Sequence, residues 1–211
     1  MHVSDFMRRI SLANHPVTRV KHLHIYFIWF PGAWDQFVGR IFDLCPRLVT
    51  LWLDHDVRYG IVPPLRRLDR LQNLRDLTIP MVYATGGEFP EMRLPSVTHL
   101  HFVPVYTRDK LHVPWLRSFP KLTHLGFMEE TKHECVVRAA NSKPALIVLV
   151  RGPRLSPIHD QVVYLLYSSL TPCSDWLKRA SPAWNPDHAS GPVWDPWMFA
   201  DHVMAQRKRG M

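Results

Sequence analysis

Residues 94–102, LPSVTHLHF, decide the fold, because they return almost residue for residue at 119–127 as FPKLTHLGF. A repeat at a fixed spacing is typical of a solenoid, in which each unit is too small to bury its own apolar face and stacks on its neighbours. The shared unit reads L-x-x-L-x-L, and the same spacing occurs earlier at residues 20–25, 48–53 and 74–79. The sequence therefore predicts a series of stacked units, each with one strand.

The spacing of these units identifies the kind of solenoid. Successive units are 28, 26, 23 and 25 residues apart, measured between their central leucines: Leu23, Leu51, Leu77, Leu100 and Leu125. Leucine-rich repeats have periods of about 20–29 residues. We therefore expect an α/β fold, an irregular leucine-rich-repeat solenoid with a parallel concave sheet and with helices and loops on the convex side.

Return helices are expected between the strands. Residues 34–44, 63–74 and 131–141 carry apolar side chains at helical spacing, and a short helix is expected at residues 4–12. In the fourth unit Trp115, Leu116 and Phe119 are the expected packing residues.

The repeat is lost after residue 151, so we expect a solenoid domain at 1–151 and a capping region at 152–211. A sixth strand at 145–150 is apolar on both faces, which is typical of a strand covered on both sides. A further strand is expected at 161–167 and a short helix at 174–180. The last helix is expected to start after Asp195 and to close the hydrophobic end of the solenoid. Its apolar face is Trp197, Ala200, Val203 and Met204.

Composition sets wider bounds. The chain has 211 residues, 46% of them hydrophobic, and a formal net charge of +8 with few runs of basic residues. Its three cysteines (Cys45, Cys135, Cys173) form no disulfide or metal framework, which favours a cytoplasmic or nuclear location. The most apolar run, 25–30, is too short to span a membrane, so no membrane partner is expected.

Motifs for catalysis are absent, including G-x-S-x-G, H-E-x-x-H, the Walker loop and the dinucleotide glycine fingerprint. Asp54 and Asp56 flank His55, but a solvated loop accounts for them. We expect no enzymatic activity and no cofactor.

The expected binding surface follows from the alternation of side chains along a strand. If the consensus leucines face the core, their neighbours face the concave surface, where a solenoid binds its partners. The predicted partner-binding residues are His22, His24, Tyr26, Trp52, Asp54, Asp76, Thr78, His99, His101 and His124, with Thr50 beside them. Trp52 is the expected anchor, because tryptophan is enriched among binding hot spots.

Two alternatives stay open. His99, His101 and His124 can present three nitrogens to zinc, as in a metal-binding protein or a hydrolase. Thr98 and Thr123 are expected to point into the core, however, which leaves no acceptor to orient the imidazoles. The basic charge suggests a nucleic-acid binder, but no face interleaves aromatic and basic residues, so no nucleic-acid partner is expected.

The repeated P-x-[L/V]-T-x-L-x-[L/F] run, with Cys45-Pro46 and Phe119-Pro120 before two copies, resembles the leucine-rich-repeat portion of fungal, mushroom-type F-box proteins. The spacing of Asp195, Trp197, Ala200, Val203 and Arg207 resembles that family's terminal helix. The resemblance implies the substrate-recognition half of a ubiquitin-ligase subunit, with a protein to be ubiquitinated as partner. The family's F-box precedes the repeats, and no segment before Val20 is long enough to hold it, so no contact with the ligase adaptor is expected.

Overall fold

The computed structural model describes residues 19–27, 34–55, 67–80, 93–103, 113–127, 133–143, 146–151, 162–165 and 196–209. By its internal contacts the chain divides into two compact units, Met1–Leu122 and Thr123–Met211. They are called unit 1 and unit 2 below, and each is described by itself. The predicted domains, 1–151 and 152–211, divide the chain elsewhere, and that division stays a prediction.

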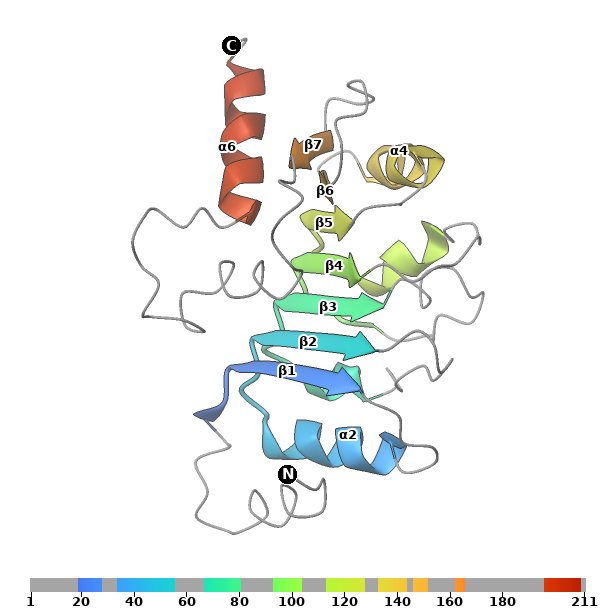
Figure 1. Cartoon of the computed structure of the whole chain (residues 1–211), viewed down its shortest axis with the longest axis vertical. Helices are drawn as coiled ribbons and strands as arrows, with labels where there is room; N and C mark the ends of the chain where they lie inside the picture. Colours follow the sequence, from blue (N-terminus) through green and yellow to red (C-terminus); the bar gives the residue numbers. More distant parts are fainter. Residues whose placement is uncertain are drawn as a thin grey trace. The chain divides into compact units, whose positions relative to one another are not determined.

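Unit 1 contains four parallel strands that lie side by side in chain order (Figure 1). The strands are β1 (His22–Phe27), β2 (Thr50–His55), β3 (Asp76–Pro80) and β4 (His99–Val103). Their register places Leu23, Leu51, Leu77 and Leu100 at one level. The alignment of the repeats in the sequence is thus the alignment of the strands in space.

A backbone turn recurs before the strands at the position of the repeat. The amides of Leu48, Leu74 and Val97 each donate to the carbonyl three residues earlier, at N···O distances of 3.2, 3.1 and 3.4 Å. The carbonyl of Val49 then accepts the amides of both Arg75 and Asp76 at the start of the next strand, at 2.8 and 3.0 Å. Each turn therefore satisfies its own polar groups and starts the next strand in register.

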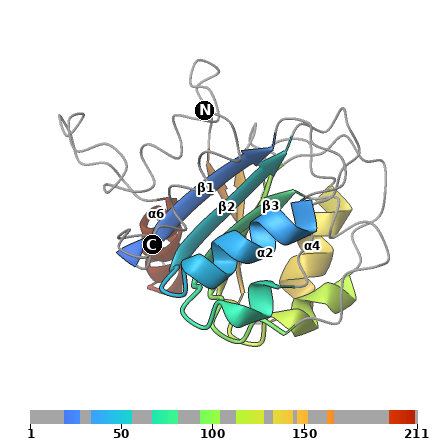
Figure 2. The ribbon, with the colours of Figure 1, turned by 90° about the horizontal axis from the view of Figure 1, so that it is seen from below.

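The consensus leucines of β2, β3 and β4 are buried as predicted, whereas Leu23 of β1 is only half-buried. Leu51, Leu77 and Leu100 are at most 1% exposed. Helix α2 (Trp34–Leu44) lies on one side of strands β1–β3, where Figure 2 also shows the short helices η3 (Leu68–Arg70) and η4 (Val113–Ser118). These elements supply further buried residues: Val38, Ile41 and Phe42 from α2, Leu68 from η3, and Trp115, Leu116 and Phe119 from η4 and its end.

One helix prediction in unit 1 is wrong where it can be compared. The sequence predicts a helix over 63–74, but the described part, from Arg67 on, contains only the 3₁₀ turn η3. Leu68 and Leu71 are both buried, since a 3₁₀ turn also places residues three apart on one side. The apolar spacing therefore predicted the burial of these two leucines correctly, but it predicted a helix that is longer than the observed 3₁₀ turn. The end of β2 likewise includes Asp54 and His55, which were expected in a loop.

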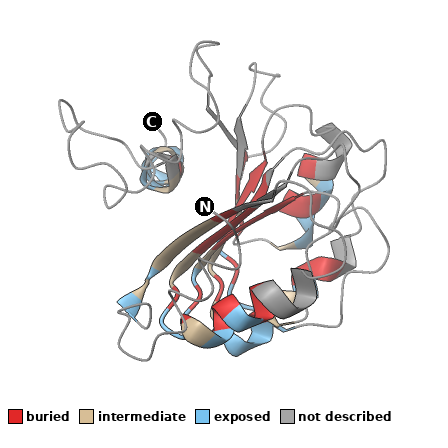
Figure 3. Cartoon of the chain, turned by 60° about the horizontal axis from the view of Figure 1, so that its bottom comes forward, coloured by how far each residue is buried: buried red, intermediate tan, exposed pale blue. Residues whose placement is uncertain are grey.

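Unit 2 contains three parallel strands, β5 (His124–Phe127), β6 (Ile147–Arg151) and β7 (Val162–Leu165), in chain order. Figure 1 shows α6 (Pro196–Lys208) on one side of these strands and α4 (His133–Ser142) on the other, and Figure 3 marks the buried residues in red. Leu125, Val148 and Val162 share one register level and are buried, as are Val136, Ala139 and Ala140 of α4. The predictions of β6, β7, α4 and the last helix are confirmed.

Two helix predictions concern residues outside the described ranges. They are the helix at 4–12 and the helix at 174–180.

Candidate functional site

Two rows of side chains cross the four strands of unit 1, on the side away from the consensus leucines. The register aligns His22, Thr50, Asp76 and His99, here called the outer row. It also aligns His24, Trp52, Thr78 and His101, here called the inner row. These residues were predicted to share one face of the strands, because side chains two residues apart point to the same side.

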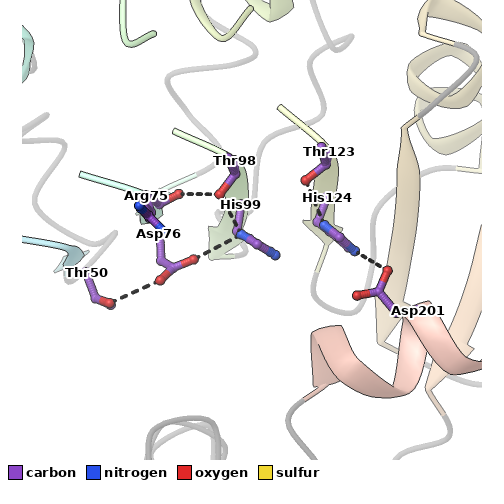
Figure 4. Close-up of polar contacts among 8 residues, drawn as sticks. All are labelled: Thr50, Arg75, Asp76, Thr98, His99, Thr123, His124 and Asp201. Atoms are coloured by element: carbon purple, nitrogen blue, oxygen red, sulfur yellow. Dashed lines mark hydrogen bonds and ion pairs between the residues drawn. The ribbon is translucent and has the colours of Figure 1, made fainter. Parts of the chain in front are cut away.

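The outer row carries a hydrogen-bonded chain on neighbouring strands (Figure 4). Thr50 Oγ1 donates to Asp76 Oδ2 at 3.2 Å, and His99 Nδ1 lies 3.2 Å from Asp76 Oδ1. A carboxylate only accepts hydrogen bonds, so this contact is favourable when Nδ1 of His99 carries a proton, and we infer that tautomer. Asp76 is therefore held from both sides, while its side chain stays 38% exposed and that of His99 25% exposed.

Thr98 belongs to this network, and its predicted orientation into the core is wrong. Its side chain is half-buried, with Oγ1 2.9 Å from His99 Nδ1 and 3.5 Å from the carbonyl oxygen of Arg75. Because Nδ1 donates to the carboxylate, the hydroxyl proton of Thr98 is directed to the Arg75 carbonyl. The imidazole of His99 is thus oriented by Asp76 and Thr98, which corrects the expectation that no acceptor orients it.

Three of the four inner-row residues are buried and His24 is half-buried, which corrects the expectation that this row faces solvent. Trp52 and His101 are each 3% exposed, and Thr78 is 9% exposed. The rings of His24 and Trp52 lie 5.4 Å apart between centroids, and those of Trp52 and His101 lie 6.3 Å apart, edge to face. His24 and Trp52 lie on adjacent strands, whereas Trp52 and His101 lie on either side of β3, which carries the smaller Thr78 at this register position. Trp52 is therefore a packing residue and not an accessible anchor for a partner.

Unit 2 buries His124, which was also expected to be exposed. Its side chain is 8% exposed, and its Nε2 lies 3.0 Å from Oδ1 of Asp201 on α6 (Figure 4). Its Nδ1 lies 2.9 Å from Oγ1 of Thr123, and its ring meets that of Trp197 edge to face with centroids 5.6 Å apart. Thr123 is exposed, so its predicted orientation into the core is wrong as well.

The last helix is responsible for this burial. Trp197, Ala200, Asp201 and Met204 follow the spacing of one helical face, which α6 presents to the strands of unit 2. Asp201 was missed in the sequence, although a carboxylate amid an apolar helical face is a recognisable sign of a buried partner. The predicted cap is therefore confirmed as a helix, but it covers a strand face that was expected to stay open.

Metal binding by His99, His101 and His124 receives no support from the part of the chain that the structure describes. No three His, Cys, Asp or Glu side chains come together there in a way that could hold a metal ion. Both ring nitrogens of His124 already have polar neighbours, as has Nδ1 of His99.

Three further residues named in the sequence analysis are Tyr26, Asp54 and Cys45. Tyr26 and Asp54 lie opposite each other in the register of β1 and β2, but their side chains lie outside the described part of the structure. Cys45 is buried, and burial raises the pKa of its thiol, which makes it a poor nucleophile. Cys45 therefore packs as a small apolar side chain.

Comparisons with protein-family models, with curated proteins and with solved structures each returned no match. Among the helices that the structure describes, none is long and apolar enough to cross a membrane.

Proposed function

We propose that the chain is a non-catalytic protein-recognition module whose contact surface is the outer row of unit 1. In this proposal the recurring turns and in-register strands belong to an irregular leucine-rich-repeat solenoid. Two observations support it. The same backbone turn recurs at Leu48, Leu74 and Val97, and the consensus leucines stay in register across β1–β4.

The observation that carries the proposal is the state of Asp76. Its carboxylate is fixed by Thr50 and His99, yet its side chain is 38% exposed. An acceptor that is already oriented loses little conformational freedom when it binds, which favours specific recognition. The fitting partner is a protein surface that offers a lysine, an arginine or backbone amides to this carboxylate.

The inner row has a different part in this proposal. Trp52 and His101 are buried, so they support the strands beneath the contact surface rather than touching the partner. The expectation that Trp52 anchors the partner is therefore wrong. Loss of Trp52 is expected to destabilise unit 1 itself.

The resemblance to F-box proteins extends the proposal to the class of partner. By that resemblance the bound protein is a substrate for ubiquitination, and binding takes place in the cytoplasm or nucleus. Contact with the ligase adaptor is not part of the proposal.

The test is affinity capture from cell extract followed by quantitative mass spectrometry. The tagged parent chain is compared with Asp76→Lys, which reverses the charge of the contact residue, and with Asp69→Lys, an exposed aspartate of η3 outside the row. We expect at least one partner of the parent to fall about tenfold or more with Asp76→Lys and to be retained by Asp69→Lys. Thermal unfolding establishes that both variants are folded. Equal recovery of every partner by the two variants contradicts the proposal.

A further inference from the structure

Helix α6 rests on unit 2 through a narrow contact. Ala200 is its one described residue that is fully buried, and it packs with Trp197, Val203 and Met204 of the helix and with Ile147 of β6. The rest of the helix is largely exposed, including Met198 at 64%. Most of the helix surface therefore contributes nothing to its attachment.

The polar anchors of α6 are accessible to competitors. Asp201, which holds His124, has a side chain 59% exposed. Arg207 is exposed and donates from a guanidinium nitrogen to the carbonyl oxygen of Val162 at 2.9 Å. Because Asp201 and Arg207 are exposed, water and polar groups of another molecule can reach the hydrogen bonds that they make. Both anchors can thus be exchanged for equivalent groups from another molecule.

His124, beneath α6, has the same local sequence as His99 of the outer row. His124 follows a threonine and precedes a buried leucine, as His99 does, and both imidazoles contact an aspartate. In unit 1 that aspartate lies on the neighbouring strand. In unit 2 it comes from a helix, beside an aromatic ring that covers the imidazole.

We propose that α6 is a displaceable internal ligand, which occupies a second recognition surface on β5–β7 formed by His124 and Ile147. The partner that replaces it is a protein helix with an aromatic residue, a small residue and a carboxylate at positions i, i+3 and i+4. These are the positions of Trp197, Ala200 and Asp201. The 30 residues between Leu165 and Pro196 tether α6, so a partner competes with a ligand held at high effective concentration.

This inference rests on the proposed function only in treating a strand face as a recognition surface. It involves none of the outer-row residues of unit 1, so its experiment can fail while the capture experiment with Asp76→Lys succeeds, and the reverse.

The experiment uses a fluorescent synthetic peptide of residues 194–211 as the probe and the full chain as the receptor. Ala200→Glu in the receptor introduces a charge at the buried contact and is expected to release its own helix. Met198→Glu introduces the same charge on the exposed side of α6 and is the matched control. By fluorescence anisotropy, Ala200→Glu should bind the peptide at least about tenfold more tightly than the parent or Met198→Glu. A peptide that itself carries Ala200→Glu should not bind.

Two results overturn the inference: equal peptide binding by parent and Ala200→Glu, or no binding by an Ala200→Glu chain that still unfolds cooperatively. If Ala200→Glu does not fold, Asp201→Lys takes its place, because this exposed position tolerates the change and lysine cannot accept the proton of His124 Nε2. The same two results then decide.

Discussion

The sequence Thr-His-Leu occurs in both units, and its surroundings give it two different states. In unit 1, Asp76 of the neighbouring strand meets Nδ1 of His99, and the imidazole stays partly exposed. In unit 2, Asp201 of α6 meets Nε2 of His124, and the imidazole is buried beneath Trp197. A carboxylate requires the proton on the nitrogen that it faces, so the two histidines have opposite tautomers. An identical local sequence therefore presents different chemistry according to where its partner carboxylate comes from.

The largest expected effect is the loss of stability on replacing Trp52, and the matching change at Trp197 provides the comparison. Trp52 packs against His24 and His101, and Trp197 packs against His124. Trp52→Ala should lower the free energy of unfolding by about 3–5 kcal/mol, because Trp52 is 3% exposed between His24 and His101. Trp197→Ala should have a clearly smaller effect, since Trp197 is only partly buried. Urea unfolding measures both. Equal losses would mean that α6 is as firmly packed as the strands of unit 1.

The consensus leucines provide the next comparison. Leu100 and Leu125 follow the two histidines and are both fully buried. Leu100→Ala and Leu125→Ala should each lower the free energy of unfolding by about 2–5 kcal/mol. A loss below about 1 kcal/mol in either variant is incompatible with the register described for that unit.

Replacement of the two aspartates should have a smaller effect. Asp201→Ala leaves buried His124 Nε2 without its acceptor and should cost about 1–3 kcal/mol in unfolding free energy. Asp76→Ala should cost about 1 kcal/mol or less, because the imidazole of His99 is partly exposed to water. Thermal unfolding ranks the two variants, and the reverse order would contradict the difference in burial.

Nuclear magnetic resonance sharpens the same comparison. At neutral to mildly basic pH, long-range proton–nitrogen spectra should show His99 protonated at Nδ1 and His124 protonated at Nε2. Asp201→Ala should change the spectrum of His124 and leave that of His99 unaltered. Identical tautomers in the parent chain would refute the assignment of the two carboxylate contacts.

The smallest expected effect is a pH dependence of the unfolding free energy, and it arises from Cys45 rather than from either histidine. Burial raises the pKa of Cys45 above its unfolded value, so the folded chain retains the thiol proton longer than the unfolded chain. The stability is complete below the unfolded pKa, about 8.5, and falls as the pH rises above it. Cys45→Ala should remove this decline in a series of unfolding curves from pH 7 to 10. A decline that persists in the variant must come from another group.

Much of the strand arrangement could be predicted from the L-x-x-L-x-L spacing, since stacked units must bury equivalent residues. It placed Leu51, Leu77 and Leu100 in the core and the histidine rows on the other face. The length of the turn at Leu68 could not be predicted, because residues three apart share a side in both α- and 3₁₀-helices. The exposure of Trp52, His101 and His124 was predicted wrongly, because the alternation of side chains assigns a residue to a face and does not show what covers that face.

The sequence by itself therefore determined the period, the strand register and the residues of each face, because these follow from local geometry that repeats along the chain. Only the tertiary structure decided that Trp52 is buried and that Asp201, 77 residues after His124, pairs with it. The physical reason is that burial and hydrogen-bond partners depend on contacts between distant segments, which no spacing within a repeat records.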